Sequence, residues 1–295
     1  MLRTKAGRRR LRWTLEALGV VAFVIYGLTL GHRPQAENVA VQLPGLPQEV
    51  RVVFLSDPHR SWYFAASRIR AAVELARKAQ PQLVLLGGDY VTGHRRYAQS
   101  CAAELRRLRP PLGALAVLGN HDHWVGPQTV REALERAGVR VLENQTAVVE
   151  VSGGRLAILG VGDTGTGHAE VAKAFRDAPA GTPAIVLSHN PDVVYLLGGR
   201  KPALVLCGHT HGGQVAWVGR FLVKSRFGQS HPAGLYHFRG DKVYVTRGVG
   251  AIMPPLRVGC RPEVTILDLQ PARSTAHGTP EARPRSRATA RTSGG

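Results

Sequence analysis

The chain has 295 residues, of which 44% are hydrophobic, and its formal net charge at pH 7 is +19. This length and apolar share are those of a globular protein that can bury a sizeable core. The chain has three cysteines and no CxxC pair, which argues against a disulfide framework or a thiolate zinc site.

The positive charge is spread unevenly along the chain. Residues 1–12 carry +6, residues 271–295 carry +4, and residues 39–270 carry +10. A basic surface favours polyanions, including phospholipid headgroups and nucleotide phosphates. The basic residues do not alternate with aromatic ones, as they do in proteins that bind single strands. We therefore expect no specific nucleic-acid partner.

An apolar segment over residues 13–31 follows the basic residues 1–12, and only Glu16 interrupts it. Its length is close to the ~20 residues needed to cross a bilayer. Cations before the segment predict a cytoplasmic N-terminus, with the rest of the chain outside the cytoplasm. We expect a retained, single-pass anchor in the cell membrane. A cleavable signal peptide is the alternative, because it has the same basic and apolar regions.

Three further regions follow the anchor. Residues 32–48 hold Pro34, Pro44, Gly45 and Pro47 and are predicted to be a linker. Residues 49–270 are predicted to be one folded domain. Residues 271–295 are rich in Pro, Ser, Thr and Arg, and we expect this basic tail to be disordered.

Within the domain, segments with strand and helix patterns alternate early, and strands dominate later. We expect an α/β fold of two packed mixed sheets with helices outside. The predicted strands are 51–56, 83–86, 114–118, 156–160, 184–188, 203–207, 214–218, 242–246 and 264–269. The predicted helices are 67–79, 98–108, 129–137 and 169–175.

Five of the predicted strands end in residues that commonly bind metals. In open α/β sheets, ligands bind in the crevice beyond the carboxyl ends of the strands. We therefore expect these side chains to meet and form a dinuclear metal site. In chain order they are Asp57 and His59; Asp89; Asn120, His121 and Asp122; His189; and His209 and His211.

The order D-x-H, G-D, G-N-H-D, H, G-H-x-H resembles that of the calcineurin-like metallophosphoesterases, over about residues 50–270. The sequence at residues 208–214, 246–248, 255–257 and 261–263 is also similar to that of one branch of the family, the membrane-linked bacterial phosphoesterases. That branch includes a lipid A pathway pyrophosphatase acting on a UDP-diacylglucosamine. Pro58 stands where a leucine is more usual, which should alter the loop but not the flanking ligands.

The resemblance implies a four-layer αββα sandwich and two divalent metal ions. The mixture of carboxylate, amide and imidazole suits Mn²⁺, Fe or Zn²⁺, and the sequence does not choose among them. Asp89 stands alone at its strand end and is the natural bridging carboxylate. The implied ligands are Asp57, His59, Asp89 and His211 for the first metal, and Asp89, Asn120, His189 and His209 for the second.

By the same resemblance, His121 is a catalytic residue that protonates the leaving oxygen or steadies the transition state, and Asp122 holds its other ring nitrogen. Arg247 and Arg257 lie in loops after late strands, where a guanidinium can grip a phosphate bidentately. The alternative for both is an ordinary surface arginine.

Together these features predict a dimetal phosphoester hydrolase with an extracytoplasmic catalytic domain. Its expected substrate is a phosphodiester or pyrophosphate of a membrane lipid or nucleotide-linked lipid precursor, as for a UDP-2,3-diacylglucosamine hydrolase. The alternatives are a nuclease or phosphoprotein phosphatase of the same superfamily, or a metal-binding module without catalysis.

Overall fold

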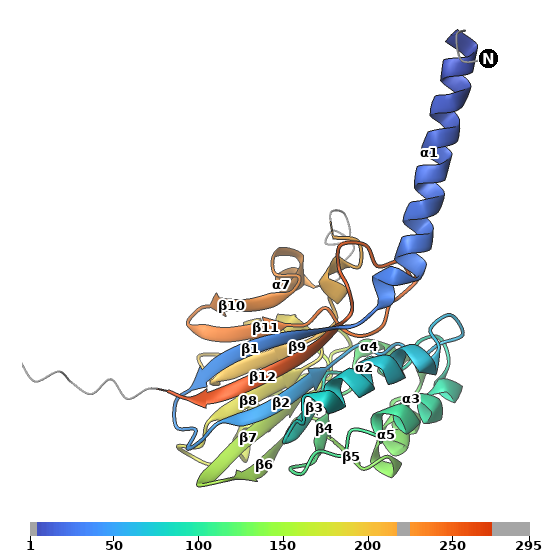
Figure 1. The fold of residues 1–295 in the computed structure, drawn as a ribbon. Coiled ribbons are helices and arrows are strands. Elements are labelled where there is room, and N and C mark those ends of the chain that lie inside the picture. The colour runs from blue at the N-terminus through green and yellow to red at the C-terminus, as the bar shows by residue number, and fades with distance from the viewer. Residues whose placement is uncertain (1–4, 217–224, 273–295) are drawn as a thin grey trace, which may run out of the picture.

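Two six-stranded mixed sheets pack face to face in the computed structural model, which describes residues 5–216 and 225–272 (Figure 1). The first sheet has the strand order β1-β12-β2-β3-β4-β5. Strands β2 to β5 are parallel, and β12 runs antiparallel to β2 and parallel to β1. Its strands are β1 (Gln35–Leu43), β2 (Val50–Leu55), β3 (Leu83–Leu86), β4 (Ala114–Ala116), β5 (Val139–Val141) and β12 (Glu263–Pro271).

The second sheet has the order β10-β11-β9-β8-β7-β6. Its four middle strands are parallel, and the two edge strands pair antiparallel with their neighbours. The strands are β6 (Gln145–Val151), β7 (Gly154–Val161), β8 (Ala184–Ser188), β9 (Leu204–Cys207), β10 (Gly234–Phe238) and β11 (Asp241–Val245).

Helices cover the outer face of each sheet, which confirms the predicted four-layer arrangement. The longer ones are α2 (Ala66–Lys78), α3 (Ala98–Leu105) and α5 (Pro127–Arg136), over the first sheet. The short ones are α4 (Asn120–Val125), α6 (Val171–Arg176) and α7 (Arg226–Ser230). Single 3₁₀ turns are η1 (Leu30–His32), η2 (Arg95–Tyr97), η3 (Pro191–Tyr195) and η4 (His211–Gly213).

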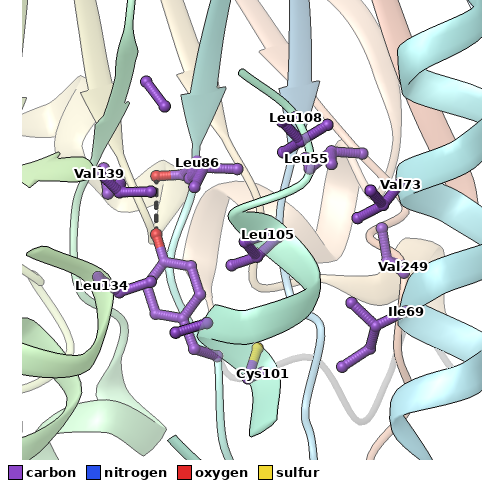
Figure 2. Close-up of a cluster of buried hydrophobic side chains, with 14 of the residues drawn as sticks. Leu55, Ile69, Val73, Leu86, Cys101, Leu105, Leu108, Leu134, Val139 and Val249 are labelled. Atoms are coloured by element: carbon purple, nitrogen blue, oxygen red, sulfur yellow. Dashed lines mark hydrogen bonds between the residues drawn. The ribbon is translucent and has the colours of Figure 1, made fainter. Parts of the chain in front are cut away.

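The pleat of the strands divides the apolar residues among three hydrophobic layers. In β2, Phe54 points between the sheets while Val53 and Leu55 point toward the helices. Figure 2 shows the layer beneath the helices, where Tyr90 donates a hydrogen bond to the Leu86 carbonyl at 3.2 Å. Successive residues of a strand face opposite sides of a sheet, so strands buried on both faces are apolar throughout.

The N-terminal helix α1 (Lys5–Leu28) stands away from the sheets (Figure 1). Within the described residues, it is the helix long and apolar enough to cross a membrane, with a mean hydropathy of 1.5 over its best window. Its large apolar side chains are exposed, and only Gly27 is buried. Residues 1–4 and the tail from residue 273 onward lie outside the described part of the chain.

Strands β5, β6 and β10 and the short helices α4 and α7 were not predicted, and two expected segments have a different structure. Most of the expected linker, residues 32–48, is the edge strand β1, which pairs with β12 from the other end of the chain. The expected strand over 214–218 is not formed in its described part, where an isolated bridge joins Val215 to Val258. Residues 217–218 lie outside the described residues. The glycines before Gln214 favour the 3₁₀ turn η4 instead.

Candidate active site

Five of the candidate ligands have left-handed backbone conformations, which non-glycine residues seldom adopt. Such strain clusters at functional sites because the surrounding structure must hold it. All five directly follow the ends of β2, β3 and β9. Their φ angles are 58° for Asp57, 46° for His59, 56° for Asp89, 70° for His209 and 52° for His211.

Two glycines near these residues lie in surroundings that leave no room for a side chain. A Cβ on Gly208 would lie 2.4 Å from Oδ2 of Asp57, and one on Gly119 would lie 2.2 Å from Oδ1 of Asp89. The glycines of the G-H-x-H and G-N-H-D motifs therefore let neighbouring strand ends approach the two carboxylates.

Asp57, His59 and His211 form the first cluster, and all three side chains are buried. The Nε2 atoms of His59 and His211 are 2.9 Å apart. Oδ1 of Asp57 lies 3.5 Å from Nε2 of His211 and 3.7 Å from Nε2 of His59. Two ring nitrogens and a carboxylate oxygen thus converge on one point.

His189 is the centre of the second cluster. Its Nδ1 lies 2.8 Å from the Gly87 carbonyl, to which it donates, so in the neutral ring Nε2 carries a lone pair. Nε2 faces Oδ2 of Asp89 at 3.2 Å, Oδ1 of Asn120 at 3.1 Å and Nδ1 of His209 at 3.2 Å. Burial opposes protonation of His189, but Asp89 outweighs it and raises the pKa of the ring well above its ordinary value. This cluster of carboxylate, amide and imidazole atoms can hold a cation.

Asp89 joins the two clusters. Its Oδ2 lies 3.2 Å from Nε2 of His189 and 3.5 Å from Nε2 of His59, so one oxygen faces both groups. Burial would raise the pKa of Asp89, but His189 and His59 lower it overall, and the group is a carboxylate. This geometry fits a bridging ligand.

The kinds of ligand atom in this centre fit two divalent metal ions. All seven predicted ligands lie in one connected group of carboxylate, amide and imidazole atoms, which suits Mn²⁺, Fe or Zn²⁺. The three cysteines are free and buried, and none belongs to these clusters.

His121 lies at the edge of this group, but Asp122 does not hold it as predicted. Both oxygens of Asp122 accept backbone N–H groups: Oδ2 from Asp89 at 2.8 Å and Gly119 at 3.0 Å, and Oδ1 from Tyr90 at 2.9 Å and Val91 at 3.3 Å. Burial and the nearby Asp89 raise the pKa of Asp122, and the backbone N–H donors of Gly119 and Val91 oppose this shift. Asp122 therefore shapes the loop that carries Asp89.

Thr92 is the partner of His121 that sequence reasoning missed. Its Oγ1 lies 3.4 Å from Nδ1 of His121 and 2.5 Å from Nδ1 of His59. Burial lowers the pKa of His121 to about 4. Trp124, 66% exposed, packs its ring 4.8 Å from that of His121.

The predicted phosphate contact is wrong for Arg257, whose side chain is completely buried. Its Nε donates to the Gly250 carbonyl at 2.8 Å, and its Nη2 donates to Nδ1 of His211 at 3.2 Å. Arg247 is partly exposed, but its guanidinium lies 2.8 Å from Glu37 and 3.1 Å from Glu263. Arg257 therefore stabilises loops of the protein, and Arg247 is held by ion pairs to two glutamates.

A fold of two sheets with an Asp/His/Asn centre at the strand ends is that of a dimetal phosphoesterase. The Calcineurin-like phosphoesterase family matches residues 50–213, and the chain belongs to this family. It is a metal-dependent phosphoester hydrolase, and the family uses two divalent metal ions.

Several relatives share most of the chain. Phosphodiesterase YaeI of Escherichia coli strain K12 is 37% identical over 74% of this chain and 82% of its own length. A zebrafish transmembrane protein with a metallophosphoesterase domain is 29% identical over 88% of this chain and 63% of its own. Among solved structures, the 5′-nucleotidase precursor of Thermus thermophilus aligns with a TM-score of 0.47 and 17% identity. That alignment covers 75% of this chain and 54% of the other.

Proposed function

We propose that this enzyme hydrolyses a phosphodiester or pyrophosphate bond of a membrane lipid or a nucleotide-linked lipid precursor. The observation that carries the proposal is the candidate membrane span α1, which continues into the domain through the single turn η1. An enzyme held at a bilayer meets membrane-bound substrates at a high effective concentration.

Residues of the Asp/His/Asn centre would hold the two metal ions, and their neighbours would act on the substrate. Asp57, His59, Asp89 and His211 would hold one metal ion, and Asp89, Asn120, His189 and His209 the other. When bound, the two ions supply Lewis acidity for the phosphoryl oxygens and a water of lowered pKa. His121 supports the departing oxygen by donating an N–H, with Thr92 facing its other nitrogen. Asp122 keeps the Asp89 backbone in place.

A substrate panel tests the proposal. The full chain in detergent would be assayed, after chelation and with added Mn²⁺, on bis-p-nitrophenyl phosphate, p-nitrophenyl phosphate, a UDP-linked acylated sugar and single-stranded DNA. We expect the diester and the acylated sugar to be cleaved, and the activity to require added metal.

Each arm of the panel separates one alternative. Preference for single-stranded DNA, with steep salt dependence, would replace the lipid substrate with nucleic acid. Preference for the monoester would favour a phosphatase. Undiminished turnover in excess chelator, after prolonged dialysis, would contradict the metal-dependent mechanism itself.

A further inference from the structure

Two loops at the base of α1 expose large hydrophobic side chains. Trp62 follows β2 and is 75% exposed, and Ile252 and Met253, between β11 and β12, are 36% and 55% exposed. The loop around Ile252 is well fixed, because Gln214 accepts its N–H at 2.6 Å and donates to its carbonyl at 3.2 Å. Exposed apolar side chains on a fixed loop indicate a surface that contacts something apolar.

These loops are fastened to the end of α1 (Figure 1). The Arg257 N–H donates to the Gly27 carbonyl at 3.1 Å, and the Arg68 guanidinium donates to the Leu28 carbonyl at 2.9 Å. Nε2 of His32 lies 2.7 Å from the Pro255 carbonyl, and its ring packs against Phe64. The last turn of α1 is therefore part of the domain surface and not a flexible tether.

The length of α1 brings this surface to the membrane. The apolar part of the helix from Trp13 to Leu28 rises roughly 24 Å at about 1.5 Å per residue. The hydrocarbon core of a bilayer is about 30 Å thick. A helix this short, fixed rigidly to the domain, cannot hold the loops away from the bilayer that it spans.

We propose that Trp62, Ile252 and Met253 insert into the interface of the bilayer that α1 spans. Tryptophan is favoured at that depth because its ring is apolar and its N–H is polar. Exposed Arg33, beside η1, would face the phosphate headgroups. We call the side chains of Trp62, Ile252 and Met253 the membrane wedge.

The membrane wedge lies close to the active site along the chain, and the loop before Ile252 contacts the site, because the Gly250 N–H donates to the Asp57 carbonyl at 2.7 Å. Trp62 is three residues after His59, and Gln214, which holds Ile252, is three residues after His211. The proposal rests on the membrane placement in the proposed function and adds to it: the loops that carry His59 and His211 would lie at the bilayer surface, where a lipid-linked phosphoester is reached without leaving the membrane.

Site-specific fluorescence tests the membrane wedge. Trp62→Cys and Met253→Cys would be made in the full chain, labelled with nitrobenzoxadiazole and reconstituted in phosphatidylcholine/phosphatidylglycerol vesicles. Wild-type protein gives the background labelling, since its three cysteines are buried. Val148→Cys is the matched control, because Val148 is also exposed but lies on β6, far from α1 (Figure 1). Val20→Cys reports on α1 itself.

We expect blue-shifted emission and strong quenching by spin-labelled lipids at positions 20, 62 and 253, and neither at 148. Quenching at position 20 with none at 62 and 253 would overturn the membrane wedge and leave the anchor intact. Equal signals at 62, 253 and 148 would also overturn it. None of these readouts depends on turnover, so failure of the proposed substrate class would be seen separately.

Discussion

The carboxylate of Asp122 accepts the backbone N–H of Asp89 at 2.8 Å, so one buried acid fixes the backbone of another. The same carboxylate binds three further N–H groups, two of them in the loop after β3. Asp89 can therefore keep its left-handed conformation and present Oδ2 to both histidine clusters.

Replacing Asp122 with asparagine should destabilise the protein and lower metal binding together. The amide would point an N–H₂ group at two backbone N–H groups, and each buried donor left without an acceptor costs about 1–3 kcal/mol. Urea unfolding and metal analysis would measure the two effects. Asp268→Asn is a control, since it removes an exposed ion pair with Arg51, a kind of pair worth about 0–1 kcal/mol. Equal stability of the two variants would contradict the role given to Asp122.

Replacing Asp89 with asparagine should reduce bound metal at both positions, because one oxygen faces both clusters. His59→Ala should affect the first position more than the second, since His59 belongs to the cluster with Asp57 and His211. Metal analysis of the purified variants distinguishes the two patterns. Full occupancy of both positions in Asp89→Asn would remove the bridging assignment.

The sequence could predict those parts of this centre that depend on neighbouring residues in the chain, and it could not predict those that depend on distant ones. The strand ends were predictable, because apolar runs such as Leu83–Leu86 stop directly before the ligands. The function of Asp122 was not, because its partners follow a different strand, and neighbouring positions in sequence suggested a bond to His121 instead. Arg257 was misassigned because arginine is rarely buried, and its partners are carbonyl groups of separate loops.

The fold shows the same limit. Strand β1 was missed because its Gln, Glu and Asn residues and the flanking prolines are typical of a linker. It forms through pairing with β12, more than 200 residues later, and such pairing leaves no local pattern. Only Val41 and Leu43 of β1 are buried, so its apolar signal was weak.

The junction between α1 and the domain should weaken as the pH falls. Burial lowers the pKa of His32 from 6.5 to about 4, so the folded state favours the neutral ring. A lowered folded-state pKa means that this stability is present above pH 6.5 and is lost as the pH falls from 6.5 toward 4. In detergent, lowering the pH from 7.5 to 5 should reduce the melting temperature less for His32→Gln, which cannot titrate, than for the wild type. The corresponding losses in the free energy of unfolding should differ by about 1 kcal/mol. Identical pH dependence would show that His32 is not the responsible group.

A reporter fused after residue 270 should lie outside the cytoplasm, because the cations before Trp13 outnumber Arg33 after the segment. An export-dependent phosphatase reporter should be active there and inactive when fused at Arg12. The opposite pattern would place the active site on the cytoplasmic face and make a cytoplasmic lipid precursor the first substrate to test.

Replacing His121 with asparagine should keep both metal ions and lower kcat by about 10²–10⁴-fold on an ester with a poor leaving group, because the variant lacks the imidazole beside the leaving oxygen. The loss should shrink for a p-nitrophenolate ester, whose leaving group needs little protonation. His94→Asn is the control, since His94 is exposed and only caps η2. The three-residue cluster of His59, Asp89 and His121 also makes metal binding by His121 a measurable alternative. A variant that loses one metal ion would make His121 a ligand, whereas normal metal content with normal turnover of an alkyl phosphodiester would remove it from catalysis.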